Sequence, residues 1–176
     1  MNLASKLSQR IGIHDIQEVV LITANNNDYK QELYDLIYSA DDLVGYQALW
    51  VFTHFSREDN QWLFDKQEEL IDEVLICRHP GKRRLLLNLL LKQPLSTPPR
   101  TDFLDFCLDR MISKDELPGV QSLCLKLAYL LCLPIPELLQ EYRTMLEIME
   151  PNMLQISLRT ARKNILIALN KKNMRL

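Results

Sequence analysis

The chain has 176 residues, of which 47% are apolar and 25% charged, a composition ordinary for a soluble globular protein of one domain. No apolar run approaches the roughly 18–20 residues of a membrane span, and the start of the chain lacks the apolar segment of a signal peptide. We therefore expect a cytoplasmic protein that does not contact membranes. Only four glycines are present, which disfavours a fold built on hairpins and favours an all-α protein.

The net charge of −2 is unevenly distributed along the chain. No acidic residue follows Glu150, whereas the first 150 residues carry 15 basic and 23 acidic side chains, a net charge of −8. The basic residues after Glu150 are Arg159, Arg162, Lys163, Lys171, Lys172 and Arg175. The acidic body argues against a general nucleic-acid-binding protein. The basic segment keeps a narrower contact with an anionic partner open.

Turn residues and charge patterning divide the first half of the chain into predicted helices. The run Asn25–Asp28 ends one helical segment and caps a helix that reaches about Ser39, because Asn and Asp side chains satisfy free helix N–H groups. Asp41 and Asp42 cap the next helix in the same way. From 60 to 77, apolar residues recur at helical spacing opposite acidic ones. This pattern predicts an amphipathic helix with an acidic outer face.

Proline punctuates the rest of the chain. We expect His79 to end one helix and Pro80 to start another, which is apolar nearly all round and reaches about Lys92. Residues 93–101 hold three prolines and form the clearest loop. This loop is either a domain boundary or, as we favour because the same pattern resumes, a connector between repeats. Further helices are predicted over 102–112, 117–132 and 134–149, and from 153 onward.

Three of the four glycines recur in one local pattern, 36 and 38 residues apart. Gly45, Gly81 and Gly119 each begin a segment that reads Gly, any residue, Gln or Arg, any residue, Leu, any residue, Val or Leu. Such a recurrence indicates a helix pair that stacks on copies of itself. We interpret the glycines as equivalent positions where a neighbouring helix approaches closely or the helix entry bends, rather than as a phosphate-binding loop.

A repeat of this length, made of two antiparallel helices, resembles the HEAT and armadillo-like α-solenoids. The segments that carry the resemblance to the closing repeats of small HEAT-like proteins are Gly119–Ala128, Pro136–Tyr142 and Leu158–Lys163. The resemblance covers roughly residues 28–170 and implies an α-solenoid with a binding surface. We predict a single domain over 1–176, with an N-terminal cap over 1–27 and repeats over 28–57, 58–93, 101–133 and 134–171.

No residue pattern specifies a reaction, a metal or a cofactor. Cys77, Cys107, Cys124 and Cys132 lie in separate apolar stretches without C-x-x-C spacing, so we expect reduced thiols in the core. The three histidines fall in different units and lack H-x-x-x-H or H-E-x-x-H spacing. We therefore expect no catalysis, no metal and no cofactor.

A basic cluster occupies one predicted helix start. Lys82, Arg83 and Arg84 fall in the first turn, where the helix dipole disfavours positive charge. The compensating group is either the acidic face of the preceding helix, through Asp72 or Glu73, or an anionic partner. Both readings stay open at the level of the sequence.

The favoured function is a non-catalytic interaction module that binds a peptide or helix of another protein along its repeat surface. An aromatic cluster around Trp50 and Trp62 is either core packing, as we favour, or a recognition hot spot. The predicted contact residues are Trp50, Arg83, Arg84, Arg159, Arg162 and Lys163. We expect the two groups of cations to share an edge and to contact an acidic protein segment.

Two other classes of function remain as alternatives. One is a DNA-binding protein similar to the DNA glycosylases that use a HEAT-like solenoid, which the acidic body disfavours because phosphate contacts dominate DNA affinity. The other is a purely structural or oligomerisation unit.

Overall fold

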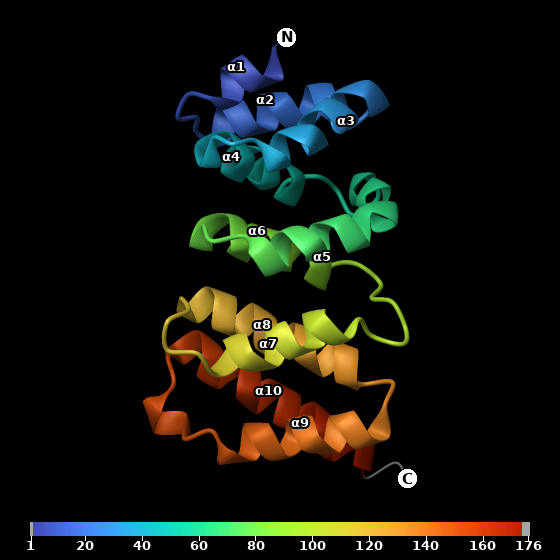
Figure 1. Cartoon of the computed structure of the whole chain (residues 1–176), viewed down its shortest axis with the longest axis vertical. Helices are drawn as coiled ribbons and strands as arrows, with labels where there is room; N and C mark the ends of the chain where they lie inside the picture. Colours follow the sequence, from blue (N-terminus) through green and yellow to red (C-terminus); the bar gives the residue numbers. More distant parts are fainter. Residues whose placement is uncertain (1, 174–176) are drawn as a thin grey trace. The chain divides into compact units, whose positions relative to one another are not determined.

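The computed structural model describes residues 2–173, and within them every regular element is a helix, which confirms the all-α prediction. The chain forms two compact units, Met1–Gln93 and Pro94–Leu176, each described here by itself. In each unit the helices pack in chain order, as in a HEAT-repeat solenoid (Figure 1). Among the described helices, none has both the length and the apolar content that crossing a bilayer requires.

The first unit contains six α-helices and two 3₁₀ helices. They are α1 (Leu3–Leu7), α2 (Ile13–Thr23), α3 (Asn27–Asp35), η1 (Leu36–Tyr38), α4 (Asp42–Thr53), η2 (Asp59–Lys66), α5 (Gln67–Ile76) and α6 (Pro80–Leu91). Helix α4 packs against α1, α2, η1 and α6, and α5 packs against α6. Apolar side chains of α4 and α6, including Leu49, Phe52, Leu86 and Leu87, are fully buried in this unit.

The predicted caps hold two helix starts in this unit. The Asn26 side chain accepts hydrogen bonds from the N–H groups of Asp28 and Tyr29 at 3.0 and 3.1 Å and starts α3. The Asp41 side chain accepts from the Leu43 N–H at 2.9 Å and starts α4. Both side chains satisfy N–H groups that have no partner within the helix.

Two local predictions in this unit are wrong. The expected single helix over 60–77 divides into η2 and α5, because the Asn60 amide donates to the Phe52 and Phe55 carbonyls and ties the segment to the end of α4. His79 does not end a helix but caps α6, with its Nδ1 accepting from the Lys82 N–H at 3.1 Å. Pro80 holds the residue before it in extended backbone, which is the conformation of an N-cap.

The second unit is built around a central helix. Its helices are α7 (Thr101–Ile112), α8 (Pro118–Cys132), α9 (Pro136–Ile148), η3 (Pro151–Met153) and α10 (Ile156–Asn173). Helix α8 packs against α7, α9 and α10, and the buried Tyr142 hydroxyl of α9 donates to the Leu125 carbonyl of α8 at 2.7 Å. The last helix starts later than residue 153, because Pro151 first opens a short 3₁₀ turn.

The repeated glycines lie in the first turns of α4, α6 and α8, but not at the same position from the helix start. Gly81 and Gly119 are the second residues of α6 and α8, whereas Gly45 is the fourth residue of α4. A Cβ on Gly45 would lie 2.8 Å from the Ile37 carbonyl oxygen and 3.0 Å from the end of the Lys82 side chain. The expected close approach is therefore confirmed at Gly45.

The close approach between α4 and α6 is reciprocal. Gly45 receives Lys82, the residue after Gly81, and a Cβ on Gly81 would lie 3.1 Å from the ring of Tyr46, the residue after Gly45. Each glycine thus makes room for the side chain that follows the other glycine. This pairing places the starts of α4 and α6 side by side.

Replacing Gly45 tests this packing. Alanine raises helix propensity by about 1 kcal/mol, but overpacking against a backbone carbonyl costs about 1–3 kcal/mol. We expect Gly45→Ala to lower the thermal midpoint by roughly 2–6 °C, since about 1 kcal/mol shifts a chain of this length by 2–4 °C. Thermal unfolding followed by circular dichroism measures the shift.

Gly12→Ala serves as the matched control, because its Cβ would meet nothing closer than the Asp15 carboxylate at 3.9 Å. Gly12 is an N-cap residue, so we expect a loss of no more than about 1 kcal/mol. Equal loss in the two variants, or a gain for Gly45→Ala, would contradict the close approach.

Candidate functional site

The third position of the repeated pattern performs one structural task in three places. The Gln47 amide donates to the Leu7 and Gln9 carbonyls at 2.6 and 2.7 Å, at the end of α1. The Arg83 guanidinium donates to the carbonyl of Cys77, which caps the end of α5. The Gln121 amide donates to the carbonyl of Ser113, which caps the end of α7, at 2.6 Å. The Gln or Arg in the pattern therefore satisfies carbonyls where an earlier helix ends.

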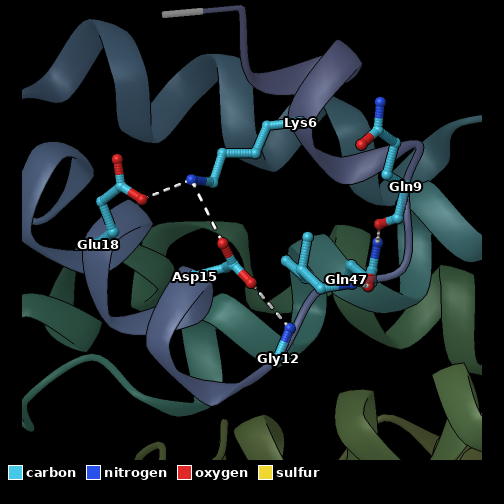
Figure 2. A network of polar contacts seen from close by, with 7 residues as sticks. Lys6, Gln9, Gly12, Asp15, Glu18 and Gln47 are labelled. Carbon is cyan, nitrogen blue, oxygen red and sulfur yellow. Dashed lines mark hydrogen bonds and ion pairs between the residues drawn. The ribbon is translucent and has the colours of Figure 1, made fainter.

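Gln47 is buried, with 2% exposure. Its Oε1 also accepts from the Ile11 N–H at 3.0 Å, so one amide holds the whole loop after α1 (Figure 2). Beside it, Lys6 lies 2.5 Å from Glu18 and 3.7 Å from Asp15. These contacts tie α1 and the loop after it to the first half of α2 and to α4.

Two of the three cations at the start of α6 have partners within the fold. The Lys82 Nζ, in a side chain 6% exposed, lies 3.6 Å from the carboxylates of both Asp42 and Glu73. Arg83 donates to the end of α5 as described. Glu73 of the preceding helix therefore pairs with Lys82, and it is one of the two residues predicted for this role. Arg84 is exposed on the surface of α6.

Trp50 belongs to a row of rings along one side of α4. Tyr46, Trp50 and His54 are four residues apart, with ring centroids at 6.4 and 6.0 Å, and Tyr46 lies 6.0 Å from the ring of His79 at the start of α6. Tyr46, Trp50 and His79 are half-buried and His54 is exposed. We call these four residues the aromatic row; the four-residue spacing of three of them is the sequence signal that would have revealed it.

The helical register places Arg84 on the side of α6 that faces this row. A Cβ on Gly81 would lie 3.1 Å from the Tyr46 ring, and Arg84 follows Gly81 by three residues, a spacing that puts both on one side of α6. From this register we expect the exposed Arg84 guanidinium to lie beside the half-buried rings of the row.

Trp62 belongs to a different cluster, so the aromatic residues separate into two groups. Its ring stacks on the buried Phe52 at 6.4 Å and meets Tyr34 edge-on at 5.9 Å. The Lys66 Nζ lies over both the Tyr34 and Trp62 rings, at 4.6 and 4.8 Å. Trp62 and Trp50 are both half-buried, but Trp62 packs on the buried Phe52 whereas Trp50 packs on Tyr46 and His54.

Two tyrosines near Trp62, Tyr34 and Tyr38, have raised pKa values. The Tyr34 hydroxyl donates to the Glu69 carboxylate at 2.8 Å and lies 2.8 Å from the Tyr38 hydroxyl. Burial, with the carboxylates of Glu69 and its neighbours, raises the pKa of Tyr38 to about 12. Burial raises the pKa of Tyr34 still further.

The cations of the last helix lie in the second unit, and two of them contact backbone. Arg159 is exposed and donates to the Leu154 carbonyl at 3.0 Å, whereas the half-buried Arg162 donates to the Leu146 carbonyl of α9 at 2.7 Å. Lys163 is exposed. Arg175 and the Lys172 side chain lie outside the described residues. An edge shared between these cations and those of the first unit stays a prediction.

The four cysteines lie inside the two units. All four thiols are free and buried, which confirms their predicted place in the core. Burial raises the pKa of Cys132 to about 11, which keeps it protonated at neutral pH. Within residues 2–173, no three or more histidine, cysteine or carboxylate side chains gather as a metal ion would require.

Stacked helix pairs with polar side chains closing the helix ends define a helical-repeat protein. The chain matches the HEAT repeat domain over residues 3–169 and belongs to this family. Searches of curated proteins and of solved structures give no match. The family is generally non-catalytic and typically serves as a protein-interaction scaffold.

The two ion pairs of Lys82 give a matched test of burial. Glu73 and Asp42 lie at the same 3.6 Å from Nζ, but their side chains are 12% and 64% exposed. We expect Glu73→Gln to destabilise the fold by roughly 1–3 kcal/mol, because it leaves a buried cation poorly paired. Asp42→Asn should cost less than about 1 kcal/mol. Urea unfolding measures both, and equal losses would contradict the buried role of Glu73.

Stability should fall at alkaline pH through the tyrosine pair. Both folded pKa values lie above the value near 10 of an unfolded tyrosine. The stabilisation contributed by the protonated Tyr38 is therefore fully present below pH about 10 and is lost as pH rises through its folded pKa of about 12. We expect the urea midpoint to fall across this window, and to fall less steeply in Tyr38→Phe. A flat midpoint between pH of about 9 and 12 would contradict this linkage.

Proposed function

We propose that this protein is a non-catalytic scaffold that binds a peptide or helix of another protein along the surface of its second helices. The observation that carries the proposal is the aromatic row beside Arg84. Tyr, Trp and Arg are the residues that dominate binding energy at protein interfaces, and here they reach solvent on helices that repeat proteins use for recognition.

The predicted contact residues divide into two roles under this proposal. Arg83 and Arg162 donate to carbonyls near the ends of α5 and α9, so they hold the backbone of the surface. Trp50 and Arg84 contact the partner in the first unit. Arg159 and Lys163, which are exposed and four residues apart, contact it in the second unit.

Acidic side chains are the partner groups that such cations favour. An arginine fork binds a carboxylate through two parallel hydrogen bonds. The net charge of −8 over the first 150 residues would repel a long nucleic acid. The proposed partner is therefore a protein segment that combines apolar or aromatic side chains with carboxylates.

Capture of partners from a cell lysate tests the row directly. We expect Trp50→Ala and Arg84→Ala to reduce the captured amount of specific partners by about ten-fold or more, as hot-spot residues do. Arg57→Ala and Ile76→Ala are the matched controls, since both residues are exposed in the same unit and lie outside the row. Quantitative mass spectrometry measures capture, and thermal unfolding verifies each fold.

Two outcomes would contradict the proposal. In the first, the row variants and the controls capture the same proteins in the same amounts. In the second, the chain binds a DNA duplex at physiological salt and loses this binding in Arg84→Ala, which would support the DNA-binding alternative.

A further inference from the structure

The second unit contains an apolar pocket at the edge where its helices turn. The pocket has a volume of about 450 Å³ and lies between the end of α7, the start of α8 and the α9–α10 connection. This volume is within the range of about 300–1,000 Å³ that is typical of ligand sites. Met111 and Leu158 are lining residues with at most 2% exposure. The pocket therefore has a preformed apolar floor.

Exposed apolar side chains surround this floor. The large apolar residues exposed at this edge are Ile112, Leu117, Ile148, Met153 and Ile156. Ile112 and Met153 line the pocket, and each of the other three is adjacent in sequence to a lining residue. Met153 and Ile156 are 81% and 79% exposed, respectively. Large exposed apolar side chains beside a pocket with charged lining residues favour a protein-interaction site over a small-molecule site.

The rim of the pocket carries positive charge. Lys114 is exposed and lines the pocket. Arg159 does not line it but donates to the carbonyl of the lining residue Leu154 at 3.0 Å, and Lys163 follows Arg159 by one helical turn. The Glu116 carboxylate in the pocket is 3% exposed and lies 3.2 Å from Arg110, so it is already neutralised. Glu150 is the lining acid that remains at the surface.

We propose that this pocket binds an amphipathic helix of another protein that places Leu-like side chains on one face and carboxylates beside them. The proposal rests on the scaffold function and adds a site and the chemistry of one partner. An apolar groove receives such a helix through side chains at i, i+3 or i+4, and i+7. Three methionines in the lining, Met111, Met149 and Met153, adapt their shape to the side chains that enter.

Charge complementarity selects this partner over a second copy of the chain. In a symmetric dimer the same patch meets itself, and here three cations, Lys114, Arg159 and Lys163, would face one surface acid, Glu150, from each copy. Like charges across an interface are strongly unfavourable. Carboxylates on the incoming helix instead pair with these cations.

The test uses a fluorescent peptide of roughly 16 residues, long enough to form a helix when bound. The acidic peptide has leucines on one helical face and glutamates on its flanks; a scrambled peptide keeps its composition, and a third replaces glutamate with lysine. Fluorescence anisotropy at about 0.05 and 0.15 M salt measures binding. We expect the acidic peptide to bind at least about ten-fold more tightly than the other two, and more weakly at higher salt.

Variants locate the peptide on the protein. Met153→Glu and Arg159→Gln should each weaken binding by about ten-fold or more, since one adds a repelling charge to the apolar rim and the other removes a pairing charge. Leu21→Glu is the matched control, because Leu21 is 79% exposed but lies on α2 in the first unit. Ile156→Glu provides a second rim variant if Met153→Glu unfolds.

Several results would overturn the proposal. They are equal binding of the acidic and scrambled peptides, unchanged binding by both rim variants, and a concentration-dependent dimer that Met153→Glu dissociates. Co-sedimentation with phosphatidylserine vesicles without peptide binding would assign the patch to a membrane surface instead. Loss of lysate capture in Trp50→Ala with unchanged peptide binding in the rim variants would leave the scaffold function standing and remove this site alone.

Discussion

The fold depends on how the carbonyl groups at helix ends are satisfied. The last carbonyls of a helix have no partner within it, and leaving a polar group buried without a partner costs about 1–3 kcal/mol. This chain addresses the problem with a long polar side chain from a second helix. Gln47, Arg83 and Gln121 each donate to the backbone where an earlier helix ends. The same device that closes a helix end also fixes the second helix against it.

The glycines follow from the same constraint. A side chain such as Gln47 or Arg83 reaches the carbonyls of an earlier helix only when its own helix start lies near them. At α4 and α6 this closeness leaves no room for a Cβ at Gly45, where the Ile37 carbonyl and Lys82 already occupy the space. The recurring pattern therefore meets two linked requirements. The glycine lets the backbone of a neighbouring element come close, and the Gln or Arg two residues later donates to a helix end.

The sequence predicted the helices better than it predicted their precise ends. Asn26, Asp41 and the prolines at 80, 118 and 136 mark helix starts through local chemistry, and the structure confirms them. The division of 59–76 into η2 and α5 depends on Asn60 bonding to the end of α4, a tertiary contact that periodicity does not contain. The cap made by His79 follows from Pro80, which disfavours helical backbone at the residue before it and so makes His79 the start of α6 rather than the end of a preceding helix.

The candidate surfaces were less predictable because exposure is a tertiary property. The sequence does not distinguish the arginines at 83, 84, 159 and 162. In the structure, Arg83 and Arg162 donate to carbonyls at helix ends, whereas Arg84 is exposed. The pocket of the second unit gave no sequence signal, because its methionines come from two separate segments, the end of α7 and the α9–α10 connection. Those segments meet only after α8 packs against both α7 and α10. Met153 in η3 and Ile156 at the start of α10 stay exposed at that junction. Large apolar side chains left exposed beside a preformed pocket favour a surface that is covered by a partner.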